Sequence, residues 1–185
     1  MALTYSKGMP IGTRAPQFAL PGTDGKTYSL DTFADAKVLV IIFTCNHCPY
    51  AKASEDRFIA IQKDYADKGV TLVAINPNDA TRYPDDSLEH MKIRATEKNF
   101  NFPYLCDETQ QVARAYDAAC TPDIFVFDAQ RKLVYNGRMD DNWKEPEQVR
   151  RHDLRTAIDC ALQGNPVTFD PIPSMGCSIK WKEVT

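Results

Sequence analysis

The stretch Val38-Leu-Val-Ile-Ile-Phe-Thr-Cys45-Asn-His-Cys48-Pro49 determines how the rest of the chain is organised. Its first six residues are apolar and mostly β-branched or large, the pattern of a strand buried on both faces. Pro49 suits the first turn of a helix, where its missing N–H would have no partner in any case. An apolar stripe then continues to Gly69, a residue type that ends helices. The sequence therefore predicts a buried strand, two cysteines at a junction, and a helix.

The two cysteines occupy a position that favours ionised thiols. Free N–H groups and the positive end of the helix dipole stabilise an anion at a helix start, and they lower the pKa of a thiol there. The spacing of Cys45 and Cys48 brings the sulfurs within one helical turn, close enough to form a disulfide. A protonated His47 between them would stabilise the reduced pair further. We predict a redox pair in which Cys45, nearer the open end of the junction, is the low-pKa thiol.

Composition and charge exclude several classes of protein. The 185 residues fit one domain, 1–185, which ends in an extended tail at 165–185. A net charge of −3 provides no basic surface for nucleic acid, and no apolar run approaches the length that spans a membrane. The first ten residues lack the apolar core of a signal peptide, so we expect a cytoplasmic protein. Six cysteines in that setting favour redox catalysis or metal binding over a structural disulfide framework. These features leave the oligomeric state open.

The remaining elements follow from local turn and periodicity patterns. Asp24-Gly25 predicts a hairpin between two short extended pieces, and Asp31 is expected to cap a short helical turn. The same patterns predict a strand at 71–75, a helix from 87 to 99, a strand at 102–106, a short helix at 109–116, a strand hairpin at 123–128 and 132–136, and a helix from 147 to 163. This order indicates an α/β protein with a mixed sheet and helices on both faces.

The order of these elements resembles the thioredoxin fold: strand, Cys-x-x-Cys, helix and strand, then Thr121-Pro122 before a hairpin and a final helix. The segments Gly12-Thr-Arg-Ala-Pro-Gln-Phe and Phe102-Pro-Tyr-Leu-Cys-Asp-Glu-Thr-Gln resemble the AhpC/TSA, or redoxin, branch. With the segments 43–50, 83–87, 140–143 and 176–181, nearly the whole chain is similar to its peroxiredoxin-like group. The resemblance implies a three-layer α/β/α fold with a central mixed sheet, an N-terminal β-hairpin extension and an inserted helix and strand.

The resemblance also implies roles for individual residues. By position, Cys45 matches the nucleophile of thioredoxin-like proteins, and Cys48 matches the resolving thiol. Pro122 matches the cis-proline that faces the dithiol and, with Thr121, presents backbone to an extended substrate. The implied function is a thiol–disulfide oxidoreductase that acts on thiols or disulfides of proteins or small molecules. It implies no metal and no organic cofactor.

Residues that differ from the family pattern decide the order of the candidate functions. Thr44 stands where thioredoxins carry Trp, and we expect Thr44 and His47 to modulate the redox pair. The pair Cys48-Pro49 matches the Cys-Pro of peroxiredoxins, but Cys45 occupies the place of their Thr, and their peroxide-binding Arg is absent near Pro122. A thiol-dependent peroxidase therefore ranks second. A binding module without enzymatic activity, whose thiols hold a soft metal, ranks third because no second pair of ligands is evident.

Four further cysteines need an interpretation. Cys106, Cys120 and Cys160 are predicted to be core residues, because free cysteine is among the most buried residue types. Cys120, next to Thr121-Pro122, is also a candidate to line the site as a redox thiol. Cys177 lies in the tail, and its role depends on where the tail docks.

The tail is predicted to cross the domain as an extended strap. Its prolines disfavour a helix. Ile179 and Trp181 would dock it, with Lys180 and Lys182 pointing outward. Cys177 would then lie beside a fixed anchor. The favoured interpretation is an inert packed thiol; the alternative is a third redox thiol that docking brings to Cys45 and Cys48.

Overall fold

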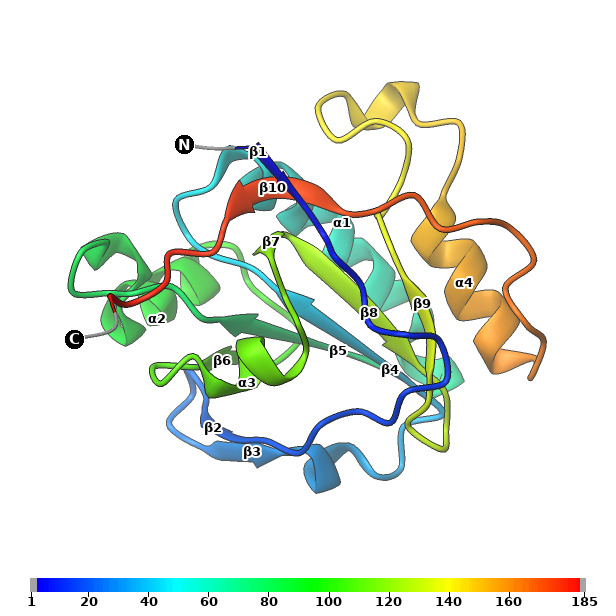
Figure 1. Cartoon of the computed structure of the whole chain (residues 1–185), viewed down its shortest axis with the longest axis horizontal. Coiled ribbons are helices and arrows are strands. Elements are labelled where there is room, and N and C mark those ends of the chain that lie inside the picture. The colour runs from blue at the N-terminus through cyan, green and yellow to red at the C-terminus, as the bar shows by residue number, and fades with distance from the viewer. Residues whose placement is uncertain (1–2, 184–185) are drawn as a thin grey trace.

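The computed structural model describes residues 3–183, so the predicted domain limits at residues 1 and 185 lie outside the described part of the chain. Its centre is a five-stranded mixed sheet in the order β6-β5-β4-β8-β9 (Figure 1). The strands are β4 (Val38–Phe43), β5 (Val70–Asn76), β6 (Tyr104–Cys106), β8 (Asp123–Phe127) and β9 (Leu133–Asn136). Because β4 runs parallel to β5 and antiparallel to β8, the predicted mixed sheet is confirmed.

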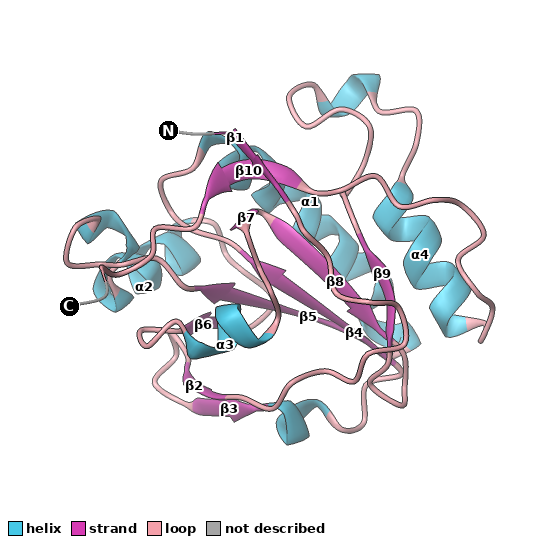
Figure 2. Ribbon diagram, viewed as in Figure 1, coloured by secondary structure: helices cyan, strands magenta, loops and turns pink. Residues whose placement is uncertain are grey.

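Helices and a hairpin cover the two faces of this sheet (Figure 2). The alternate side chains of β4 face opposite ways, and each set packs into a separate apolar cluster. One cluster includes side chains of α1 (Pro49–Tyr65), α2 (Leu88–Glu97) and α4 (Asp153–Leu162). The other includes side chains of α3 (Gln111–Ala115), the turn η1 (Leu30–Phe33) and the hairpin β2 (Ala19–Pro21) and β3 (Thr27–Ser29). The three-layer fold with its hairpin extension is therefore as predicted. No described helix has the length and apolar character needed to cross a membrane.

Two predicted helix starts are wrong, each for a local reason. The helix expected from Glu147 begins at Asp153, because the N–H groups of residues 150 and 151 bond to the Asp141 carboxylate instead of to a preceding turn. Pro146–Gln148 forms only a 3₁₀ turn, η4. At η1 the cap is Ser29, whose N–H donates to Thr32 Oγ1 at 2.9 Å, and Asp31 lies inside the first turn.

The tail docks as predicted and forms an element that the sequence did not suggest. Strand β10 (Met175–Ser178) lies between β1 (Leu3–Tyr5) and β7 (Cys120–Thr121) in a second, antiparallel sheet. Figure 1 shows β1 and β10 side by side there. Ile179 is buried in the core and Trp181 packs against it. Lys180 and Lys182 are half-buried, and Lys180 Nζ donates to the Ser178 carbonyl.

Gly176 permits the close contact between β10 and β7. A Cβ at this position would lie 2.0 Å from the Thr121 carbonyl oxygen, a distance that no side chain tolerates. We expect Gly176→Ala to push β10 away and to lower the free energy of unfolding by about 1–3 kcal/mol. Urea unfolding measures the loss, and alkylation of Cys177 should become faster. Ser178→Ala, in the same strand, is the matched control, and equal stability of the two variants would contradict this account.

Candidate active site

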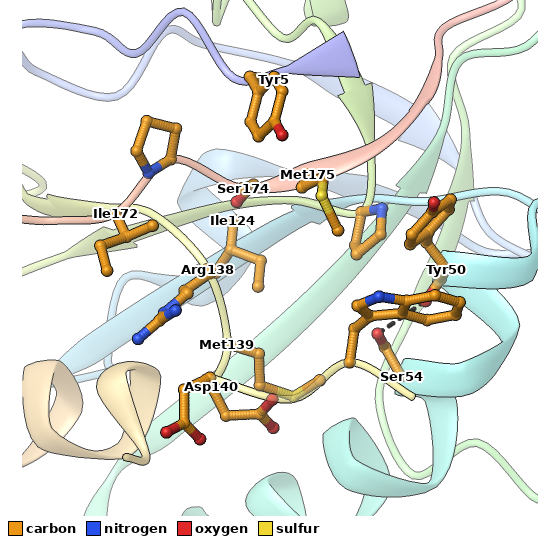
Figure 3. Close-up of a pocket in the computed structure, with 14 residues that line it drawn as sticks. Tyr5, Tyr50, Ser54, Ile124, Arg138, Met139, Asp140, Ile172, Ser174 and Met175 are labelled. Atoms are coloured by element: carbon orange, nitrogen blue, oxygen red, sulfur yellow. Dashed lines mark hydrogen bonds between the residues drawn. The ribbon is translucent and has the colours of Figure 1, made fainter. Parts of the chain in front are cut away.

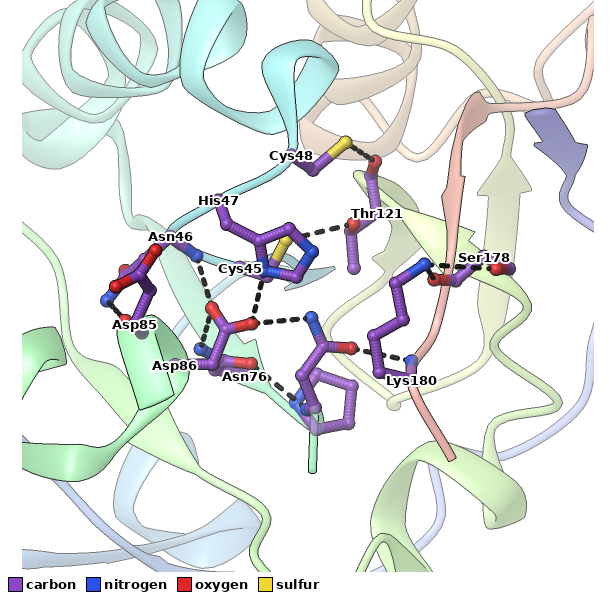
Figure 4. Close-up of polar contacts among 12 residues, drawn as sticks. Cys45, Asn46, His47, Cys48, Asn76, Asp85, Asp86, Thr121, Ser178 and Lys180 are labelled. Carbon is purple, nitrogen blue, oxygen red and sulfur yellow. Dashed lines mark hydrogen bonds and ion pairs between the residues drawn. The ribbon is translucent and has the colours of Figure 1, made fainter. Parts of the chain in front are cut away.

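The end of β4 and the start of α1 bring the two predicted redox cysteines together. Cys48 is the N-cap of α1, Pro49 is its first residue, and the Cys45 and Cys48 side chains hydrogen-bond to each other. Figure 4 shows Thr121 facing both: its Oγ1 lies 3.2 Å from Cys45 Sγ and its carbonyl oxygen 3.2 Å from Cys48 Sγ. The predicted cis-proline is confirmed at Thr121–Pro122. Thr121 is thus the residue that links this peptide to both thiols.

A third cysteine completes this group. Cys177, on β10, lies opposite Thr121 in the strand register and packs with Cys45, Cys48 and Ala51. Cys45 is 2% exposed, Cys48 0% and Cys177 3%. We call these three residues the thiol cluster. The tail therefore brings Cys177 to the predicted redox pair and covers all three sulfurs.

The surroundings of the two thiols favour Cys48, and not the predicted Cys45, as the thiol with the lower pKa. The hydrogen bond from Cys45 to Cys48, burial and the nearby charge of Asp86 raise the pKa of Cys45. The same hydrogen bond lowers the pKa of Cys48 against the effect of burial, with help from the Cys177 thiol and two backbone N–H groups. The protonated Cys48 thiol donates one hydrogen bond to the Thr121 carbonyl. When Cys48 is ionised it loses that bond, and its sulfur accepts several hydrogen bonds instead. Cys48 gains the helix-start stabilisation because it, and not Cys45, is the N-cap.

A buried carboxylate beside the cluster was missed by the sequence analysis. Asp86 ends the 3₁₀ turn η3 (Pro84–Asp86) and is 1% exposed. Its oxygens have four polar partners (Figure 4): Asn46 N–H at 2.7 Å, Asn76 Nδ2 at 3.1 Å, Asn78 Nδ2 at 2.9 Å and His47 Nδ1 at 2.5 Å. We call these five residues the Asp86 network. The sequence showed that Asn76 and Asn78 follow a buried strand, but it did not show that both bind Asp86.

The network determines what His47 and Asp86 do near the thiols. Burial opposes ionisation of Asp86, but bonds from His47, Asn78 and Asn46 outweigh it and hold the pKa of Asp86 below its usual range. The His47 ring stacks on Tyr83, with centroids 5.3 Å apart. One ligand atom each from Cys45, His47 and Asp86 lie within 4.8 Å of one another. His47 therefore pairs with the Asp86 carboxylate, so a thiolate would not be the only negatively charged group beside it.

Those three side chains are also the set to test as a metal site, since cysteine, histidine and aspartate all bind zinc. A cysteine ligand must be a thiolate, whereas the pKa of Cys45 is raised. The Asp86 oxygens already face four polar hydrogen-bond partners. The residues present fit a hydrogen-bonded network better than a metal site.

The other predicted site residues lie around the cluster. Thr44 N–H donates to the Ile75 carbonyl at 2.8 Å, which extends the pairing of β4 and β5 up to Cys45. Cys120 Sγ contacts the carbonyl oxygens of Pro122 and Ser174, and burial raises its pKa. Burial also raises the pKa of Cys106 to about 11. These environments agree with packing roles for Cys106 and Cys120.

A groove of about 160 Å³ is lined in part by Pro122 (Figure 3). The Tyr50 and Trp143 rings, 4.2 Å apart, line it together with Asp140. Arg57 fixes this wall, because it donates to Asp140 Oδ2 at 2.6 Å and to the Trp143 carbonyl at 2.7 Å. Asp140, Asp141 and Trp143, from one of the segments that carry the family resemblance, all line this groove.

Comparison with known proteins gives matches across most of the chain. The model of the AhpC/TSA family matches residues 11–136. An uncharacterized conserved protein from Geobacillus kaustophilus has a crystal structure that superimposes with a TM-score of 0.94 at 45% identity, covering 100% of this chain and 99% of that one. A hypothetical protein from Sinorhizobium meliloti 1021 gives 0.91 at 40% identity, covering 97% and 98%.

A curated relative from Helicobacter pylori J99 carries the name "Putative peroxiredoxin bcp". It is 27% identical over 110 residues, which are 60% of this chain and 67% of the relative.

Proposed function

Because this chain belongs to the AhpC/TSA family, we propose that it is a thiol–disulfide oxidoreductase whose redox pair is Cys45 and Cys48. Thioredoxin-like redox proteins act on thiol or disulfide substrates, and the fold here is thioredoxin-like. The observation that carries the proposal is the mutual hydrogen bond of two thiols at the start of α1, beside the cis Thr121–Pro122 peptide. The bond lowers the pKa of Cys48 and raises that of Cys45, which supports an attacking role for the first and a resolving role for the second.

The reaction proceeds in two exchanges. The Cys48 thiolate attacks one sulfur of a substrate disulfide; that bond breaks, a mixed disulfide forms, and the first substrate thiolate leaves. Cys45 then gives its proton to the departing second substrate sulfur and attacks Cys48 Sγ, which forms the Cys45–Cys48 disulfide. The protein is oxidised by two electrons and the substrate disulfide is reduced to two thiols. The family resemblance gave the attacking role to Cys45 and the resolving role to Cys48, and the proposed mechanism reverses these two roles.

Glutathione disulfide, added to the reduced protein under native conditions, tests the pairing. Peptide mapping should show a Cys45–Cys48 disulfide, with two equivalents of glutathione released per chain. Cys160→Ser, which alters a half-buried cysteine on α4, is the matched control and should behave as the unaltered chain. A protein that keeps both thiols, or that pairs other cysteines instead, would refute the proposal.

A thiol peroxidase is the second candidate, and the ionised Cys48 is the observation in its favour. Cys48 precedes Pro49 as in peroxiredoxins, and the Helicobacter pylori relative carries that name. Peroxide would oxidise Cys48 to a sulfenic acid, which Cys45 would condense onto with loss of water. Arg138, two residues after the end of β9, is held by another partner, because its Nε donates to Asp153 Oδ2 at 2.7 Å.

We therefore expect slow oxidation by hydrogen peroxide. Because Cys45 stands where peroxiredoxins carry their Thr, and their peroxide-binding Arg is absent near Pro122, the reaction of Cys48 should resemble that of a simple low-pKa thiol. Stopped-flow oxidation of the reduced protein measures the rate, and Arg138→Lys should leave it unchanged. A rate many orders of magnitude above that of free cysteine would promote the peroxidase over the oxidoreductase.

A further inference from the structure

Strand β10 occupies the free edge of β7 directly beside the redox pair. Its register sets Cys177 opposite Thr121 and Ser178 opposite Cys120. Thr121 is the residue whose hydroxyl and carbonyl reach Cys45 and Cys48. The strand that covers the site therefore presents a thiol to it.

We propose that Cys177 is a third redox thiol, which exchanges with the Cys45–Cys48 disulfide to form a Cys48–Cys177 disulfide. The proposal rests on the proposed function, because that reaction supplies the oxidised pair. It adds a second intramolecular disulfide to the site.

The Cys48 sulfur would take part in both disulfides, Cys45–Cys48 and Cys48–Cys177. It receives a hydrogen bond from the Cys45 thiol and others from the Cys177 thiol and Cys177 N–H. The three side chains share one apolar cluster with Ala51. Cys48 thus has a neighbouring thiol on each of two chain segments.

The position of Cys177 is fixed from several sides. On one side β1 pairs with β10, with Leu3 opposite Cys177. On the other side Gly176 allows the backbone to touch Thr121, since any Cβ there would lie 2.0 Å from its carbonyl oxygen. Two residues further on, Ile179 is anchored in the core. A preorganised thiol of this kind reacts with a high effective concentration.

Cys120 is the other cysteine near the cluster, and its surroundings differ. Its sulfur contacts the carbonyl oxygens of Pro122 and Ser174. These carbonyl oxygens can accept a hydrogen bond from a thiol, but they cannot donate one to stabilise a thiolate. Cys120 is therefore the matched control for Cys177.

The exchange needs no oxidant beyond the substrate disulfide. Cys177 loses its proton and its sulfur attacks Cys48 Sγ; the Cys45–Cys48 bond breaks, and Cys45 leaves as a thiolate that takes the proton. The step conserves electrons. Burial raises the pKa of Cys177, so in this step its proton passes to the departing Cys45 sulfur within the cluster and not to water.

This disulfide would change the chain mechanically as well as chemically. A Cys48–Cys177 bond ties β10 to the first turn of α1, whereas in the reduced protein the strand is held by hydrogen bonds and packing. It also frees Cys45 while the protein remains oxidised. Oxidation would thus lock the cover of the site in place.

Cys45→Ser isolates the proposed bond. When this variant is treated with glutathione disulfide under native conditions, Cys48 should form the adduct and Cys177 should displace it. Peptide mapping should then show Cys48–Cys177, with two equivalents of glutathione released per chain. Cys45→Ser/Cys177→Ser should stop at the Cys48–glutathione adduct and release one equivalent. Cys45→Ser/Cys120→Ser should still form the bond.

The rate at which Cys48 and Cys177 pair without the fold is measured on Cys45→Ser unfolded in urea. The Cys48–Cys177 bond should form many times more slowly there, because the fixed position of Cys177 is lost. If native Cys45→Ser stops at the glutathione adduct while the unaltered chain forms Cys45–Cys48, the third thiol is refuted and the proposed function stands. If the unaltered chain forms no Cys45–Cys48 disulfide, both proposals fail.

Should Cys45→Ser not fold, the unaltered chain provides the test. Partial oxidation should yield both Cys45–Cys48 and Cys48–Cys177 peptides, and a map with the first alone overturns the proposal.

Discussion

Cys48→Ser should have the largest effect on activity of any single substitution in the site. Cys48 is the attacking thiolate and both intramolecular disulfides need it, so this variant loses the first exchange and the internal attack that completes the reaction. Such an attack has an effective concentration on the order of 10⁵ M or more, against millimolar external thiol. We expect turnover with glutathione disulfide to fall by roughly 10³-fold or more. Cys45→Ser should fall less, because Cys177 can take its place.

Alkylation against pH separates the two cysteines independently of turnover. The reduced chain should show one thiol that titrates below the free value of about 8.5. Cys45→Ser should retain it and Cys48→Ser should lose it, because the donors converge on Cys48. Cys160→Ser is again the control. A low-pKa thiol that persists in Cys48→Ser would restore Cys45 as the attacking residue.

Asp86→Ala should have the largest effect on stability. The substitution deprives the backbone N–H of Asn46 and the side-chain amides of Asn76 and Asn78 of a buried charged acceptor, and it removes the partner of His47. Removing one partner of a buried polar group leaves the others uncompensated, at a cost of about 3–5 kcal/mol. Urea unfolding at pH 7 measures the difference.

Asp85→Ala is the matched control, because Asp85 is exposed and contributes only its carbonyl oxygen, to Asn46 Nδ2. It should change stability by less than about 0.5 kcal/mol. An equal loss in both variants would mean that the turn, and not the carboxylate, carries the effect.

The pH dependence follows from the direction of the Asp86 shift. Its pKa is lower in the folded chain than the unfolded value of about 3.9, so its contribution is present above that value. The contribution is lost as the pH falls through the lower folded pKa. The stability difference between the unaltered chain and Asp86→Ala should therefore be full at pH 6–7 and shrink on acidification below about pH 4.

The sequence was sufficient where a pattern is local. The six residues 38–43 alternate between two buried faces, Gly25 turns its hairpin at a φ of 82°, and Ser87 caps α2, all as expected. Resemblance added the cis Thr121–Pro122 peptide, which no local pattern indicates. Helix starts failed where a distant side chain, such as Asp141, took the backbone N–H groups.

The site was predictable only as far as neighbours in sequence are neighbours in space. Cys45, His47 and Cys48 could be found together because four residues contain them. Asp86 reaches them from a separate loop, and its charge adds to the effects of the Cys48 hydrogen bond and of burial, which raise the pKa of Cys45. The spacing of the cysteines carries no information about that charge. The same limit explains why β1, whose partner lies at the other end of the chain, was not foreseen.

The sheet that joins β1, β10 and β7 also bears on how the protein is synthesised. Residues 3–5 leave the ribosome well before residues 175–177, with which they pair. At about 5–20 residues per second, translation from Cys48 to Cys177 takes on the order of ten seconds. Throughout that interval a nascent chain has its reactive cysteines but not the strand that shields them. Each newly made molecule therefore meets the redox state of its surroundings before its own cover is in place.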